Sequence, residues 1–400
     1  MQYLSFFLLG IGILWGTISE SLAQEFRKWT SGEKTAVGKV DSLLEDGKVV
    51  RIELKSGKFT RIDREELSEK DQKYLKQWEK KKSAKKPSPK TTGKKKKKGE
   101  KEVPEEVVDT RTFEERETER VQHFRETGVW RWPEVREEDV AAILEKQKAF
   151  IQSIQNSFSS RGLKIYESEH FFFVSDCPPM IAHECTKYLE LAYQELCKIF
   201  SLTEAKTVWH GKCPVIAFVN EMDYRQYEGD STSAGLCHMS GEGEVYVTTF
   251  FGDMSRVEKR WNFIQVMVHE MVHGFVWRYK ARGNPPTWLN EGIAEFVSAY
   301  VVKPARSVAN KVQQGKVRMQ QTHSVGGLMQ LPRLEAWQYG AACSLVAFLL
   351  QQKPAGIGEM LEEIKEGAEW ENALQKVYQC NANQLLFAFG RTMGIPNLQP

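Results

Sequence analysis

Two histidines and an acid in one short stretch give the clearest chemical signal of the sequence. His269 and His273 are four residues apart, and Glu270 directly follows the first histidine. On an α-helix such histidines lie on one face, so both imidazoles can reach a single metal ion. Glu270 lies about 100° round the helix from His269, where it can flank a water at the metal without being a ligand. The alternative is a pair of partly buried histidines that hydrogen-bond to nearby carboxylates.

A further acid lies at a distance that favours a catalytic metal site. Glu291 follows His273 after seventeen intervening residues, so a turn and a return helix can bring its carboxylate to the same ion. Two histidines and one glutamate leave the fourth position of Zn²⁺ open, as in catalytic sites. Glu295 is one turn further along and is placed to accept a hydrogen bond from the outer N–H of a ligating histidine. The alternative for Glu295 is a solvent-facing acid.

Two helices must position these residues. The sequence predicts that the first helix begins with a capping box, with Ser255 as N-cap and Glu258 at N3. It should end before residues 283–286, which read Gly-Asn-Pro-Pro, and the second helix should open at Thr287. The apolar positions of the first helix follow the 3–4 spacing of a buried stripe: Trp261, Ile264, Val268, Val272, Phe275 and Val276.

The elements before these helices predict an α+β fold. Periodicity and turn residues indicate an amphipathic helix at 140–158 capped by Asp139, a strand at 164–174, a helix at 179–200, a buried strand at 214–219 and a hairpin at 234–249 that turns at 241–243. Everything after Ser255 is expected to be helical. Strands first and helices afterwards favour α+β over a doubly wound sheet.

The two motifs resemble those of the gluzincin metallopeptidases, in the peptidase MA-like branch that includes aminopeptidase relatives. The carrying residues are the His-Glu-x-x-His of 269–273 and the Trp-Leu-Asn-Glu-Gly of 288–292. The resemblance spans about 163–350 and implies a zincin-like domain with a helical C-terminal part. It also implies zinc bound by both histidines and Glu291, with Glu270 as general base and a peptide or protein as substrate.

Two parts of this resemblance leave alternatives open. Tyr339 matches the position of the family's oxyanion-stabilising tyrosine, but a core or surface tyrosine fits the same position. The aminopeptidases grip a free α-amine with a Gly-x-Met-Glu-Asn edge strand, and residues 234–240 lack that sequence. Whether cleavage is endo- or exopeptidic therefore stays open.

The amino terminus resembles a secretory leader. A mostly apolar run from Leu4 to Trp15 precedes Ser21 at −3 and Ala23 at −1 of a small-residue cleavage signal. We therefore expect a signal peptide at 1–23 and export to the periplasm, the cell surface or the medium. The alternatives are an uncleaved membrane anchor and a buried strand.

Residues 25–79 predict a small β module. Residues 49–55 alternate in polarity, the pairs Asp46-Gly47 and Ser56-Gly57 supply hairpin turns, and Ser68 begins a short helix. With the Arg-Lys-Trp-Thr of 27–30, these features resemble the SH3-like "homology domain 1" of yeast actin-cytoskeleton and clathrin adaptors. The resemblance implies a small barrel that binds a peptide or another domain. The alternative is a stabilising spacer without a ligand.

A lysine-rich stretch separates this module from the rest. Residues 80–102 have almost no apolar residue and predict a disordered linker, which either tethers the domains or contacts an anionic surface. Residues 103–160 form a charged, partly helical segment, and 163–400 form the metallopeptidase domain. The formal net charge of the whole chain is only +3, so no specific nucleic-acid partner is expected.

Seven cysteines occur, all after residue 176 and none in a Cys-x-x-Cys pair, which disfavours zinc-ribbon and thioredoxin chemistry. Disulfides and buried reduced thiols are both compatible with their spacing.

The sequence thus favours an exported zinc metallopeptidase. The first alternative is a non-catalytic cell-surface binding or scaffold protein that uses the SH3-like module and the basic linker. The second is a surface or nucleic-acid binder driven by the lysine run.

Overall fold

The chain divides into two compact units, Met1–Val108 and Asp109–Pro400. The computed structural model describes residues 27–31, 34–44, 49–54, 59–68, 70–76, 111–202, 207–229, 233–254 and 256–400. The predicted leader and the lysine-rich linker lie outside the described residues, as do the two predicted hairpin turns of the N-terminal module.

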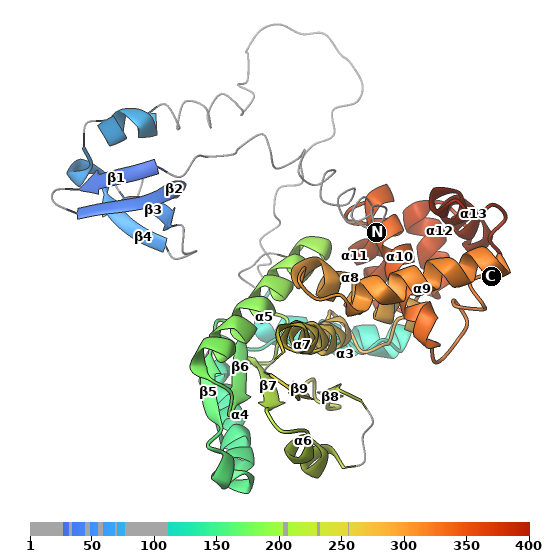
Figure 1. Ribbon diagram of the computed structural model, residues 1–400, viewed down its shortest axis with the longest axis horizontal. Helices are drawn as coiled ribbons and strands as arrows, with labels where there is room; N and C mark the ends of the chain where they lie inside the picture. The colour runs from blue at the N-terminus through green and yellow to red at the C-terminus, as the bar shows by residue number, and fades with distance from the viewer. Residues whose placement is uncertain are drawn as a thin grey trace, which may run out of the picture. The chain divides into compact units, whose positions relative to one another are not determined.

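The N-terminal unit is built on a four-stranded antiparallel sheet (Figure 1). Its strands follow chain order: β1 (Arg27–Ser31), β2 (Lys34–Leu44), β3 (Val49–Leu54) and β4 (Phe59–Asp63). The pairing of β2 with β3 shifts register between Val40 and Ser42, which marks a bulge in β2. The predicted strand at 49–55 is confirmed as β3. Closure of this sheet into an SH3-like barrel stays a prediction.

A short helix at 70–76 follows these strands and closes the small core. Ser68 caps it as predicted, because its Oγ accepts a hydrogen bond from the Asp71 N–H at 3.3 Å. Among the residues that the structure describes, the core contains the buried side chains of Trp29, Val50, Ile52, Leu67 and Leu75.

The larger unit contains a five-stranded mixed sheet in the order β5-β6-β7-β9-β8. The bounds are β5 (Lys164–Glu167), β6 (Phe171–Ser175), β7 (Cys213–Phe218), β8 (Gly235–Met239) and β9 (Val245–Phe250). Strands β6, β7 and β9 run parallel, and both edge strands are antiparallel to their neighbours. Every residue of β6 and β7 is buried, which explains their continuous apolar sequences.

Helices cover both faces of this sheet and continue beyond it (Figure 1). They are α3 (Phe113–Thr127), α4 (Glu137–Ser157), α5 (Pro179–Ile199), α6 (Glu221–Glu228), α7 (Val257–Arg278), α8 (Thr287–Val301), α9 (Ser307–Thr322), α10 (Ala336–Gln352), α11 (Gly356–Lys365), α12 (Trp370–Tyr378) and α13 (Ala382–Met393). The mixture of this sheet with a helical C-terminal part confirms the predicted α+β class. No helix in the described parts of the chain has the length and apolar character needed to cross a membrane.

The alternation along β6 assigns the two faces of the sheet. Phe172 and Val174 pack with Ile154 of α4 in one cluster. Phe171 points the other way, where its ring meets Tyr193 of α5 with centroids 6.1 Å apart. Helix α4 falls within the predicted charged segment 103–160, yet its apolar face belongs to the core of the larger unit.

Two predicted element boundaries are wrong. The single strand expected at 164–174 is a hairpin, because the chain turns where Ser168 N–H donates to Phe171 O at 3.0 Å. Helix α4 begins at Glu137 with Arg136 as N-cap, and the expected cap Asp139 instead pairs with the Arg136 guanidinium. The helix at 179–200, the strand at 214–219 and the hairpin at 234–249 are confirmed within one residue or two.

Close backbone approaches pack the helices that follow the sheet. A Cβ added at Gly292 of α8 would lie 2.8 Å from Ala342 O of α10. One at Gly340 of α10 would lie 2.0 Å from Lys311 O of α9. Helix α10 therefore touches both α8 and α9 at glycines, and this fixes the helices that surround the predicted metal ligands.

Candidate metal centre

Helix α7 is held between the sheet and the other helices by a buried apolar stripe. Ile264, Val268, Val272 and Phe275 are at most 1% exposed, as the predicted spacing requires. The helix begins after Arg256, which provides no side-chain cap, and Ser255 lies outside the described residues. Helix α8 opens at Thr287, as predicted.

The end of α7 is fixed by a lysine that the sequence analysis did not single out. The helix stops at Arg278, earlier than the predicted 282, and Lys280 adopts a left-handed conformation with φ 54°. The Lys365 ammonium of α11 donates to three backbone carbonyls. Trp277 O, in the last turn of α7, lies at 3.0 Å, and Ala281 O and Gly283 O, just after the helix, lie at 3.0 Å and 2.7 Å. A cation at the C-terminal end of a helix also complements the helix dipole. Burial lowers the pKa of Lys365 to about 7.

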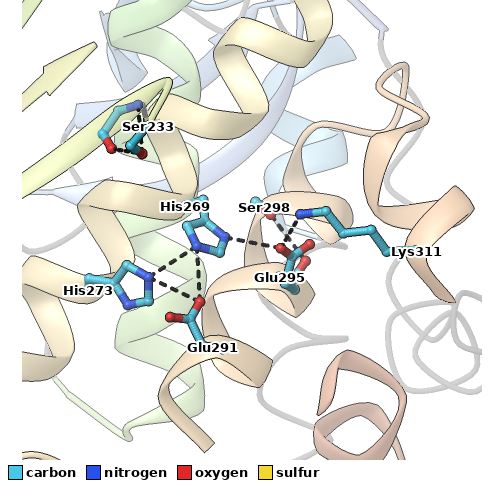
Figure 2. Close-up of polar contacts among 8 residues, drawn as sticks. Ser233, His269, His273, Glu291, Glu295, Ser298 and Lys311 are labelled. Atoms are coloured by element: carbon cyan, nitrogen blue, oxygen red, sulfur yellow. Dashed lines mark hydrogen bonds and ion pairs between the residues drawn. The ribbon is translucent and has the colours of Figure 1, made fainter. Parts of the chain in front are cut away.

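The three predicted metal ligands converge (Figure 2). The Nε2 atoms of His269 and His273 lie 3.0 Å apart, and Glu291 Oε2 lies 3.3 Å from the first and 3.4 Å from the second. A tetrahedral zinc site with bonds of about 2.0–2.1 Å has ligand-to-ligand separations of about 3.3 Å. The observed triangle therefore fits Zn²⁺ without rearrangement of the backbone.

The surroundings of the triangle also suit a cation. Glu291 Oε2 is buried and faces the Nε2 atoms of both histidines. Burial by itself raises the pKa of Glu291, but hydrogen bonds and charge from the two histidines outweigh it and lower the pKa. Burial likewise opposes protonation of His273, yet the hydrogen bond and charge of Glu291 raise its pKa to about 9.

Glu295 lies behind His269, but the structure does not form the hydrogen bond that the sequence predicts between them. Its Oε1 is 3.6 Å from His269 Nδ1, which is an electrostatic contact rather than a hydrogen bond. The carboxylate is fully buried and pairs at 2.5 Å with Lys311 Nζ of α9. The alternative of a solvent-facing acid is wrong. Lys311 was missed because its role depends on how α9 packs against α8, which local sequence does not encode.

Glu270 and Tyr339 both line the cleft that contains the triangle. This cleft has a volume of about 510 Å³, and residues of β8 form one of its walls. A Cβ at Gly235 of β8 would lie 2.9 Å from Glu270 Cγ, so only glycine lets this acid pack against the strand. Burial, with the charges of Glu291 and Glu295, raises the pKa of Tyr339. Its hydroxyl therefore keeps its proton and can donate a hydrogen bond.

Gln265, one helical turn before His269, is a polar side chain of the cleft lining that the sequence did not single out. Its position on the histidine face of α7 was the available signal. The structure forms no disulfide between the seven cysteines, all of which lie in its described part.

Comparison with known families agrees with the class of chemistry that this site suggests. Residues 182–331 match the BSP family, which is described as "peptidase of plants and bacteria". The matched segment begins in α5 and includes His269, Glu270, His273 and Glu291, whereas Tyr339 lies beyond it. No curated protein matches the chain. The match supports assignment to a peptidase family, and hence to hydrolases that act on peptide bonds.

Proposed function

We propose that the protein is a zinc-dependent metallopeptidase, with His269, His273 and Glu291 as the metal ligands and Glu270 as general base. The observation that carries this proposal is the triangle of two imidazole nitrogens and one carboxylate oxygen, 3.0–3.4 Å apart, in the wall of a cleft. Imidazole donors favour zinc over calcium and magnesium, which prefer oxygen. Three protein ligands leave a position for a reactant.

The surrounding residues supply the remaining functions of a hydrolase. Zinc, when bound, would polarise the scissile carbonyl and lower the pKa of water from 15.7 towards about 7. The Glu270 carboxylate accepts the proton of the attacking water and then donates it to the leaving amine. The Tyr339 hydroxyl donates a hydrogen bond to the carbonyl oxygen as negative charge develops there. Glu295 orients the ring of His269 from behind.

Metal analysis tests the ligand set. Purified full-length protein should contain about one zinc per chain, and His269→Ala or Glu291→Ala should lose most of it. His183→Ala is a matched control because His183 is exposed and lies on α5, away from the triangle. Retention of full zinc in both ligand variants would refute the assigned site.

Peptide cleavage tests the reaction. The wild type should cleave members of a mixed peptide library, and Glu270→Gln should abolish cleavage while zinc content stays unchanged. Glu258→Gln is the control, since Glu258 is an exposed acid in the first turn of the same helix. Zinc binding without cleavage in the wild type would indicate a binding protein built on a peptidase fold.

We also propose that the chain is exported. The support is the apolar run and small-residue cleavage signal of residues 1–23. Mass spectrometry of the mature protein from its native host should find an N-terminus at Gln24. An intact Met1 in a cytosolic fraction would exclude export.

A further inference from the structure

One end of the cleft is lined with polar groups that the proposed hydrolysis does not use. Gln265 is 3% exposed and lies one turn before His269 on α7. Its Oε1 accepts a hydrogen bond from Ser307 Oγ of α9, and its Nε2 has no partner among the described residues. A buried amide with one satisfied end and one orphaned donor inside a cleft is costly unless something binds there.

Lys311 contributes a second donor to the same end of the cleft. Figure 2 shows its side chain extending from α9 towards Glu295, on the far side of His269 from His273. Glu295 Oε1 takes one of the three ammonium N–H groups at 2.5 Å. The side chain is 38% exposed and lines the cleft, so the remaining N–H groups are accessible to a ligand.

We infer that Gln265 and Lys311 form a subsite for a carboxylate of the substrate, beside the scissile bond. This inference rests on the proposed function. Two N–H donors in the lining of one cleft, one of them charged, can serve the two oxygens of a carboxylate. An aliphatic group would leave the buried amide orphaned, and an ammonium group would be repelled by Lys311. The carboxylate can belong to an acidic side chain or to the C-terminus of the substrate.

Matched peptides test this subsite on the zinc-loaded full-length protein. Blocked hexapeptides carry a single Glu, Gln, Leu or Lys at each central position in an alanine background, and a second set has free C-terminal carboxylates. At one position we expect kcat/KM for Glu to exceed that for Leu about tenfold or more, with Lys cleaved least. If the advantage appears only with an unblocked end, the recognised group is the terminal carboxylate.

Variants identify the residues responsible. Gln265→Leu and Lys311→Met should each reduce the preference for the carboxylate about fivefold or more. Lys316→Met, on the same helix but outside the cleft lining, should leave it unchanged. The preference is a ratio of kcat/KM values for two peptides, so any general effect of Lys311 on Glu295 and His269 cancels. No carboxylate preference in the wild type, or a preference that survives both variants, would overturn the inference.

A binding measurement tests the subsite even if the proposed hydrolysis fails. If the wild type cleaves none of the peptides, their binding to zinc-loaded Glu270→Gln is measured by calorimetry. A carboxylate preference in binding that Gln265→Leu or Lys311→Met removes would support the subsite without hydrolysis. Equal binding of the Glu and Leu peptides would refute it.

Discussion

Gly340 offers a direct test of how the helices around the cleft are held. A Cβ at this position would lie 2.0 Å from Lys311 O, 2.2 Å from Lys311 C and 2.5 Å from Val312 N. All three atoms are backbone, so no rotamer change can relieve the clash. Ordinary contact begins near 3.4 Å, and the difference, 3.4 − 2.0, requires α9 and α10 to separate by about 1.4 Å.

Gly340→Ala should therefore destabilise the protein despite the better helix propensity of alanine. Overpacking of this kind costs about 1–3 kcal/mol or more, and the propensity gain returns at most about 1 kcal/mol. We expect a net loss of about 2 kcal/mol or more. Because Tyr339 is the adjacent residue and Lys311 carries the contacted carbonyl, kcat/KM should also fall, by about tenfold to a hundredfold for a shift near 1 Å.

Urea denaturation followed by tryptophan fluorescence measures the first effect, and peptide cleavage measures the second. Gly241→Ala is the matched control, because a Cβ there meets nothing within 4 Å. It should change stability by less than about 0.5 kcal/mol. If Gly340→Ala proved as stable as Gly241→Ala, the close crossing of α9 and α10 would be wrong.

Three further predictions concern the metal, the hydroxyl donor and the buried lysine. Free zinc at about 100 times its Kd should stabilise the protein by about 2.7 kcal/mol; EDTA should lower Tm, and a Tm unchanged by EDTA in a zinc-loaded sample would contradict the site. Tyr339→Phe should lower kcat about 10²-fold with little change in KM, and unchanged kcat would make this tyrosine a packing residue. Lys365→Met should destabilise the fold by about 2–4 kcal/mol at pH 8, because the backbone carbonyls at the end of α7 lose their donor. Burial lowers the pKa of Lys365 from its ordinary value of 10.5 to about 7. Between these two pH values the unfolded chain binds more protons than the folded one, so wild-type stability should rise from about pH 7 to 10.5. Denaturation midpoints measured across this pH range test the predicted rise, which Lys365→Met should lack. If the stability difference between the two proteins did not vary with pH, the carbonyls would be keeping the ammonium charged.

The ligand triangle was predictable because it is nearly local. His269 and His273 share one helical face, and Glu291 follows on the next helix after a short connection. Helical periodicity and two prolines determine that geometry almost completely. Glu295 was predictable for the same reason, since it lies one turn beyond a ligand on the same face.

The missed residues act over long separations. Lys311 reaches Glu295 only because glycines let α9 cross α10 closely, and Lys365 caps a helix whose last residue lies 87 positions earlier in the chain. The split of 164–174 into two strands was missed because the apolar run of β6 masks the turn at Ser168. In each case a tertiary contact outweighs the local pattern.

The hydrogen bonds that Lys365 donates to three backbone carbonyls at the end of α7 bear on which fragments of this protein can fold. The segment that matches the peptidase family stops at residue 331, before α10, Tyr339 and the lysine itself. It also starts after β6, the strand that pairs with β7 in the sheet. A fragment trimmed to those limits would keep all three ligands but lose the neighbours that bury α8 and secure the last turn of α7. Expression boundaries set at Asp109 and Pro400 preserve those neighbours.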